Sequence, residues 1–271
     1  MSLFKYLDFE GLQHVLNGNV KFAQPGAFND PFEMLPVLDM EAIALEREER
    51  SLSIDCDILA PRRADDGRVD ELPESLYTHD AFSRQIRDQL DRQIGVLCLC
   101  RNPSSLLMWA HYADSHTGGL IEFDEGHEYF SQGLHDVYYT KRRPRRPIGW
   151  YMNAREPIPV SELCVKSSEW GYEEEVRLIR QLSDCTRHPA RRRDFPIYTM
   201  SIPPEAIRAI TVGKRMPQDR VEQLFRKTQA RSLVFKRAEF HGSEFALEYA
   251  DLRLGSSITL GRNMKPLFKG E

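Results

Sequence analysis

The chain has 271 residues, of which 41% are hydrophobic and 29% are charged, and its formal net charge is -4. This composition is typical of a globular protein. The net charge is too small to indicate, by itself, a nucleic acid or a membrane as partner. No apolar run approaches the ~18 residues of a transmembrane helix, and the opening MSLFKYLDFEGL lacks the apolar core of a signal peptide. We therefore expect a cytoplasmic, bacterial protein without membrane attachment. The five cysteines form no CxxC pair, so we expect reduced thiols.

The N-terminal segment predicts a strand, a helix and a second strand. Residues 3–7 (LFKYL) are rich in strand formers, and residues 9–16 place apolar side chains at helical spacing. Asp8 is placed to cap the start of this helix, and Gly18 is placed to end it. Residues 20–23 (VKFA) predict the second strand.

Residues 36–94 are polar and mostly helical in pattern. Helices are predicted at 40–50 and 81–93, and the Pro- and Asp-rich sequence between them predicts a loop. We expect this region to be a mostly helical insertion in a single domain that spans residues 1–271.

The rest of the chain alternates short predicted strands with a few predicted helices. GVLCLCR predicts a buried strand, and SSLLMWAHYADSH predicts a helix. Further strands are predicted at 118–124, 135–140, 173–181, 197–202 and 233–240. Because strands outnumber regular pairs of strand and helix, we expect an α+β fold with mixed or antiparallel sheets and flanking helices.

The segment KSSEWGYEEEVRLIR carries the main catalytic candidates. On a strand over 173–181, residues two apart share a face, so Glu173, Glu175 and Arg177 are expected to lie together. A solvated face of a sheet has the same pattern. Alternatively, the carboxylates stabilise an oxocarbenium ion or orient a hydroxyl beside a cation, and Trp170 and Tyr172 supply a flat apolar wall.

A second group of candidates lies on the predicted helix after the buried strand. Trp109 and Tyr112 are three residues apart, so they are expected to be neighbours, whereas His111 points another way. Such a pair belongs either to the core or to a platform that binds a ligand. Cys100 is not expected to be a nucleophile, because its apolar neighbours raise the pKa of a thiol. The spacing of His111 and His116 is not that of metal ligands, so we expect no metal site.

The loop FNDPFE supplies two more polar candidates. Asn29 and Asp30 precede a proline, which favours extended or turn geometry. They form either a buried turn that connects two strands or a polar loop that lines a pocket beside Lys5 and Tyr6.

Two basic stretches predict loops at 141–146 and 187–193. KRRPRR and RHPARRR together hold nine Arg or Lys residues in a chain that is acidic overall. They are either solvated loops or a surface for a phosphate-bearing partner, such as a nucleic acid or a nucleotide.

Three blocks together resemble the bacterial domain of unknown function family 2971. They are LFKYLDFEGLQHVLNGNVKFAQPGAFNDPFE, SSLLMWAHYADSHTGGLIEFD and KSSEWGYEEEVRLIR, and the resemblance spans residues 3–215. The order of the predicted elements is more distantly similar to ADP-ribosyltransferase-like folds, which implies a split-sheet core.

The more distant resemblance implies an enzyme that breaks the nicotinamide–ribose bond of NAD without a metal. Glu175 matches the glutamate on a late strand and would stabilise the oxocarbenium-like state, with Glu173 completing an ExE pattern. Arg177 or Lys166 would hold that glutamate or the pyrophosphate. The ring of Trp109 or Tyr112 would stack on nicotinamide. The first strand carries Lys5 and Tyr6 where such folds usually have Arg or His.

Two alternatives stay open at the level of sequence. One is a binding module for a nucleotide or nucleic acid that uses the basic loops, which would also suit a nucleic-acid or protein acceptor. The other is a metal-dependent nuclease, in which the EVR triplet is a loose match to a nuclease strand and Asp30 is its distant acidic partner.

Overall fold

The computed structural model describes residues 1–39, 79–147, 158–192, 194–229, 233–254 and 258–260. The chain divides into two compact units. Unit 1 comprises residues 1–23, 95–137 and 169–271, and unit 2 comprises residues 24–94 and 138–168. The predicted helix at 40–50, and most of the predicted insertion over 36–94, lie outside the described residues. A single domain over 1–271 therefore stays a prediction.

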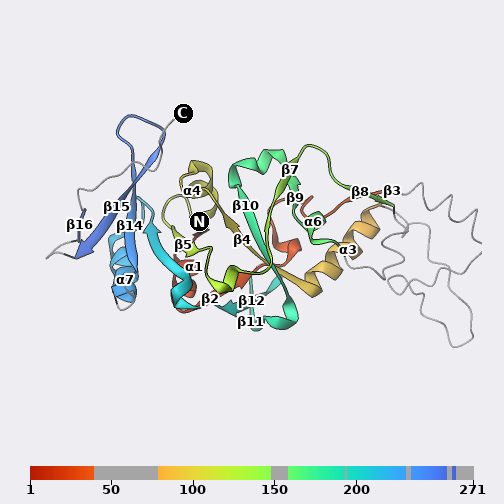
Figure 1. Cartoon of the computed structure of the whole chain (residues 1–271), viewed down its shortest axis with the longest axis horizontal. Coiled ribbons are helices and arrows are strands. Elements are labelled where there is room, and N and C mark those ends of the chain that lie inside the picture. Colours follow the sequence, from red (N-terminus) through yellow and green to blue (C-terminus); the bar gives the residue numbers. More distant parts are fainter. Residues whose placement is uncertain (40–78, 148–157, 193, 230–232, 255–257, 261–271) are drawn as a thin grey trace, which may run out of the picture. The chain divides into compact units, whose positions relative to one another are not determined.

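A nine-stranded mixed sheet forms the centre of unit 1 (Figure 1). Its strand order is β16-β15-β14-β13-β5-β1-β4-β10-β6. In chain order the strands are β1 Ser2–Leu7, β4 Ile94–Cys100, β5 Gly119–Asp124, β6 Leu134–Asp136, β10 Glu175–Gln181, β13 Ile207–Val212, β14 Val234–Phe240, β15 Leu247–Leu254 and β16 Ile258–Leu260. β13 and β14 are parallel, whereas β1 is antiparallel to both β4 and β5. The mixed sheet and its flanking helices confirm the predicted α+β class.

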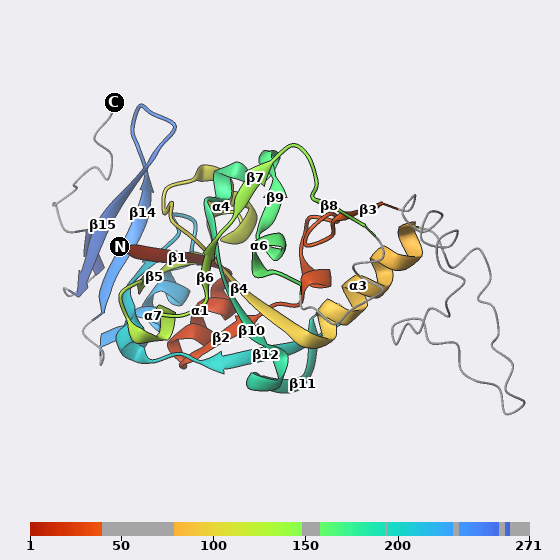
Figure 2. The ribbon, with the colours of Figure 1, turned by 45° about the vertical axis from the view of Figure 1, so that its right-hand side comes forward.

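Helices cover both faces of this sheet because its strands are apolar on both sides. Leu3 of β1 belongs to a core cluster with α1 (Phe9–Leu16) and α7 (Gln218–Gln229), whereas Tyr6 belongs to a second cluster with α4 (Leu106–Tyr112). Alternate residues of a strand point to opposite faces, so α1 and α7 lie on one face and α4 lies on the other. Figure 2 shows α1 and α7 close together on the side of β1 opposite to α4.

The start of the chain folds as its local sequence predicts. The side chain of Asp8 caps α1 by accepting a hydrogen bond of 2.7 Å from the Gly11 amide. The helix ends at Leu16, and Gly18 has a φ of +84°, which favours glycine. The chain then enters β2 (Asn19–Phe22), the third strand of a small sheet ordered β11-β12-β2.

The second basic stretch is a strand, so the prediction of a loop at 187–193 is wrong. β11 (Thr186–Arg192) pairs with β12 (Phe195–Ser201) in an antiparallel hairpin. The ladder shifts register between His188 and Arg191. The proline between them lacks an amide proton and disfavours a regular strand, and the irregularity accommodates it.

In its described residues, unit 2 has two short parallel strand pairs and two α-helices. Their bounds are β3 Val37–Asp39, α3 His79–Gln93, β7 Tyr138–Thr140, β8 Arg145–Pro147, α6 Val160–Leu163 and β9 Val165–Ser167. β3 pairs with β8, and β7 pairs with β9. α3 confirms the predicted helix at 81–93, and its Asp91 carboxylate accepts a hydrogen bond of 2.7 Å from the Gly26 amide. Among the described residues we find no helix with the length and hydrophobicity needed to cross a bilayer.

Candidate functional site

Glu175 and Arg177 form a buried ion pair on β10 of unit 1. Arg177 Nε donates to Glu175 Oε1 at 2.9 Å, and Arg177 Nη2 donates to Glu175 Oε2 at 3.0 Å. The side chains are 4% and 0% exposed respectively. Residues two apart on a strand share a face, which is why this bidentate geometry is possible. Two fixed charge-assisted bonds orient the carboxylate of Glu175 and satisfy both of its oxygens.

Glu173 does not lie on this strand, so the prediction of one strand over 173–181 is wrong at its start. Residues Ser168–Glu173 form a 3-10 helix, and β10 begins at Glu175. Between them Glu174 has a φ of 42°, a left-handed conformation that few non-glycine residues adopt. Its carboxylate accepts from Asn102 Nδ2 at 2.9 Å, and its carbonyl accepts from the Arg101 amide at 3.1 Å. These bonds hold the turn that separates Glu173 from Glu175.

A group of partly exposed rings lies beside Glu173. The Tyr112 hydroxyl, at the end of α4, donates to Glu173 Oε1 at 2.6 Å. The ring of His111 lies 6.4 Å from the rings of both Tyr112 and Tyr172, and Trp170 lies 6.1 Å from Tyr172. Glu173 itself is 4% exposed. We call these four rings and Glu173 the ring–carboxylate cluster.

Trp109 lies in the core of unit 1 and not in this cluster. Its side chain is 0% exposed, and its ring makes an edge contact with Tyr6 at 5.5 Å. The indole Nε1 donates to the Pro103 carbonyl at 3.0 Å, so its polar atom is satisfied internally. Of the two predicted alternatives, core or ligand platform, Trp109 is therefore a core residue, whereas Tyr112 is partly exposed.

Lys5 of β1 is tied to the backbone of β4, and Tyr6 is tied to the backbone that leads from β4 to α4. Lys5 Nζ donates to the Cys98 carbonyl at 2.8 Å, and the Tyr6 hydroxyl donates to the Asn102 carbonyl at 2.9 Å. Burial lowers the pKa of Lys5 and raises the pKa of Tyr6. Burial also raises the pKa of Cys100 to about 12, as the apolar sequence around it predicts, so its thiol is a poor nucleophile.

The remaining predicted ligand residues, Asn29, Asp30 and Lys166, belong to unit 2. Asp30 is buried, and its Oδ1 accepts from the Phe32 amide at 2.9 Å, which is the predicted turn; Asn29 is exposed. Lys166 Nζ lies 3.3 Å from Glu33 Oε2, and both side chains are less than 10% exposed. The structure therefore divides the predicted site residues between the two units.

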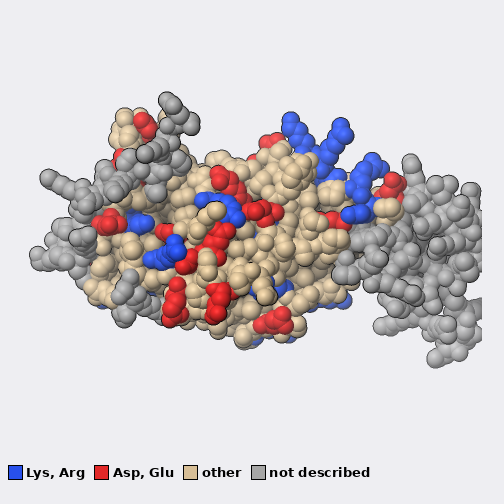
Figure 3. All heavy atoms as spheres, in the orientation of Figure 1, with Lys and Arg blue, Asp and Glu red and all other residues tan. Residues whose placement is uncertain are grey.

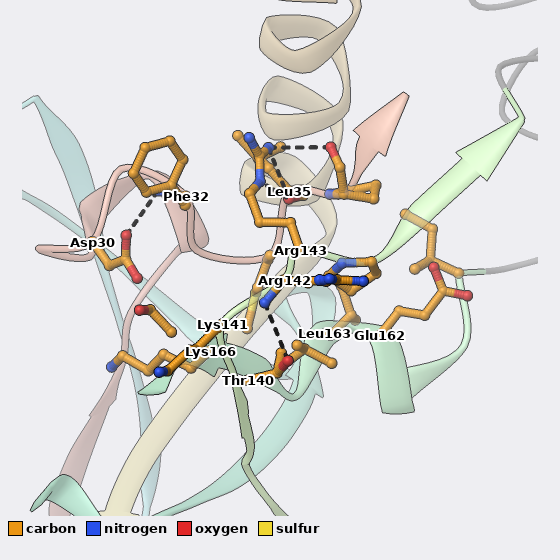
Figure 4. Close-up of a pocket in the computed structure, with 16 residues that line it drawn as sticks. Asp30, Phe32, Leu35, Thr140, Lys141, Arg142, Arg143, Glu162, Leu163 and Lys166 are labelled. Carbon is orange, nitrogen blue, oxygen red and sulfur yellow. Dashed lines mark hydrogen bonds between the residues drawn. The ribbon is translucent and has the colours of Figure 1, made fainter. Parts of the chain in front are cut away.

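A cavity of about 220 Å³ opens within unit 2 (Figure 4). The Asp30 loop, the basic stretch after β7 and the segment from α6 to β9 line it. Figure 4 shows Arg143 directed to Leu35, with Lys141 and Lys166 on the side nearer Asp30. The sequence indicated the basic stretch as a partner surface, but the cavity depends on segments more than a hundred residues apart.

Within the described ranges, no group of three or more His, Cys, Asp or Glu side chains is arranged to hold a metal ion. Among the described cysteines, Cys98, Cys100 and Cys185 are not part of a disulfide.

No curated protein and no solved structure matches the chain. A family model does match residues 108–178, which carry most of α4, the ring–carboxylate cluster and the Glu175–Arg177 pair. This part of the chain is similar to a family described as "Protein of unknown function (DUF2971)".

Proposed function

We propose that unit 1 breaks the nicotinamide–ribose bond of NAD⁺, as an ADP-ribosyltransferase-like enzyme, at the ring–carboxylate cluster. The observation that carries the proposal is the 2.6 Å hydrogen bond from Tyr112 to Glu173 beside partly exposed rings. Each ring offers a flat face, and the carboxylate supplies a fixed negative charge next to them.

This combination suits the electronic structure of the substrate. The nicotinamide ring of NAD⁺ is a pyridinium cation, and aromatic faces attract cations through their quadrupole. A carboxylate nearby adds Coulombic attraction that burial strengthens, because fewer water molecules screen it. We expect Tyr172 and Trp170 to contact the pyridinium, because both residues are partly exposed and their rings lie 6.1 Å apart.

The reaction moves positive charge from the ring to the ribose. As the C–N bond breaks, its electron pair goes to the ring nitrogen and neutral nicotinamide leaves, while the ribose becomes an oxocarbenium-like cation. We assign the stabilisation of that cation to Glu173, because its carboxylate is held by Tyr112 within the ring–carboxylate cluster. A nucleophile of the acceptor, or water, then bonds to the ribose carbon and loses a proton. Water would give hydrolysis instead of transfer.

Glu175 and Arg177 receive a positioning role in this proposal. Their bidentate pair fixes the start of β10, two residues after Glu173. Glu175 is the glutamate that the resemblance assigns to the oxocarbenium-like state, so its direct participation is the competing assignment.

The test is release of nicotinamide from NAD⁺, with bacterial lysate present as a source of acceptor. We expect release by the wild type and a loss of about 10²–10³-fold in Glu173→Gln, which is typical when a group that stabilises the transition state is removed. Glu173→Gln keeps an oxygen that can accept from Tyr112, so the fold should survive. Glu244→Gln, an exposed carboxylate of unit 1, is the matched control and should retain full activity.

The pattern among variants separates the two carboxylates. If Glu175→Gln abolishes release at unchanged stability while Glu173→Gln does not, Glu175 is the catalytic carboxylate and our assignment to Glu173 is wrong. No release by the wild type, with or without lysate, would refute the proposed reaction.

A further inference from the structure

The cavity of unit 2 has the size of a small-molecule site. Its volume of about 220 Å³ far exceeds the ~10–15 Å³ that one water molecule needs. It falls somewhat below the ~300–1,000 Å³ of pockets that enclose drug-sized ligands. A compact ligand, larger than a single ion, is therefore the occupant that the volume fits.

The cavity has an excess of positive charge after its internal ion pairs are set aside. Lys166 is paired with Glu33, and Glu162 is paired with Arg146. The charged lining residues that remain are Lys141, Arg142, Arg143 and Asp30. Three cations and one carboxylate leave two positive charges, which matches the charge of a phosphate monoester near neutral pH.

Two of these cations are available to a ligand. Lys141 and Arg142 are exposed, and neither side chain has an ion-pair or hydrogen-bond partner in the described part of the chain. Figure 3 shows Lys and Arg side chains gathered over β7 and β8. The Thr140 hydroxyl accepts from the Arg142 amide at 3.2 Å and so fixes the turn that presents both cations.

Arg143 has a different role, because its guanidinium is already occupied. It donates to the Leu35 carbonyl at 3.0 and 3.2 Å and to the Pro36 carbonyl at 3.2 Å. It also lies over the ring of Phe32, at 5.1 Å from the centroid. Arg143 thus connects the basic stretch to the Asp30 loop and keeps the cavity in shape.

The rest of the lining suits a ligand that has an aromatic ring and a hydrogen-bond donor. Phe32 is 58% exposed although it lines the cavity and carries Arg143 on one face, so part of its ring surface is open to stacking. Glu162 Oε2 is buried and has no hydrogen-bond partner among the described residues. A buried acceptor without a donor costs free energy, and a ligand hydroxyl or amino group would remove that cost.

From these three features we infer that the cavity binds a nucleoside monophosphate. The phosphate would lie on Lys141 and Arg142, the base against Phe32, and a ribose hydroxyl or base amino group would donate to Glu162. This inference is independent of the reaction proposed for unit 1, because it uses other residues and needs no cleavage of NAD⁺.

The experiment is isothermal titration of the full chain with AMP, GMP, CMP and UMP, and with adenosine and inorganic phosphate. We expect at least one monophosphate to bind more tightly than either adenosine or phosphate alone. Lys141→Ala and Arg142→Ala should each weaken it about tenfold, the typical effect of losing a hydrogen bond to a charged group. Arg145→Ala is the matched control, because Arg145 is exposed in the same stretch but does not line the cavity. It should bind as the wild type does.

Three outcomes would overturn the inference. Absence of binding by all four monophosphates would exclude the ligand class. Equal affinity for inorganic phosphate and the best monophosphate would leave no role for the base and sugar. A loss in Arg145→Ala as large as in Lys141→Ala, with a steep dependence on salt, would indicate unspecific attraction of polyanions to the basic stretch.

Discussion

Replacing Arg177 by methionine tests whether the Glu175–Arg177 pair is a buried structural unit. The guanidinium is 0% exposed and donates two hydrogen bonds, at 2.9 and 3.0 Å, to one carboxylate. The substitution leaves that carboxylate buried without either donor, and breaking a buried pair in this way costs about 3–5 kcal/mol. We expect the free energy of unfolding to fall by that amount, a large part of the ~5–15 kcal/mol typical of a folded protein.

Urea unfolding followed by circular dichroism measures this loss. A thermal scan should show the midpoint lowered by roughly 6–20 °C, since 1 kcal/mol corresponds to about 2–4 °C in a domain of this size. The double variant Glu175→Leu with Arg177→Met should recover much of the loss, because it leaves no unpaired charge. Arg208→Met is the control, because Arg208 pairs with Asp124 at 2.8 Å but is 49% exposed, and its loss should be much smaller. A cost below about 1 kcal/mol for Arg177→Met, or one equal to that of Arg208→Met, would refute the reasoning.

Three further predictions follow from single contacts. A Cβ at Gly118 would lie 2.1 Å from the Leu7 carbonyl oxygen, so Gly118→Ala should cost at least ~1–3 kcal/mol in urea unfolding; Gly242→Ala, with nothing within 4 Å, should cost little, and equal losses would contradict this. With a pKa of about 12, Cys100 at pH 8 is thiolate in roughly one molecule in 10,000, so iodoacetamide should modify it only after unfolding, as mass spectrometry can show. Burial lowers the pKa of Lys5 in the folded chain. Between this lowered value and the ordinary Lys pKa of about 10.4, the unfolded chain binds more protons than the folded chain, so the stability of the wild type relative to Lys5→Met should increase with pH. A decrease would contradict the lowered pKa.

Local sequence determined the elements whose signals lie within a few residues. The apolar spacing over 9–16, with Asp8 before it and Gly18 after it, was enough to predict α1 and its cap. The apolar run at 95–101 likewise predicted β4, and its surroundings predicted an unreactive Cys100. These features depend on propensity, capping and burial of short segments, which contacts with distant residues only reinforce.

The tertiary structure alone decided how the candidate residues are distributed. Alternation predicted that Glu173, Glu175 and Arg177 share a face, but bonds from Asn102 and Arg101 hold Glu174 in a left-handed turn that separates Glu173 from the strand. The same holds for β11, where pairing with β12 made a strand of a segment whose charge and proline favoured a loop. Partners far apart in sequence supply these hydrogen bonds, so no local pattern records them. Sequence thus determined which chemical groups the chain offers, and long-range pairing decided which of them meet.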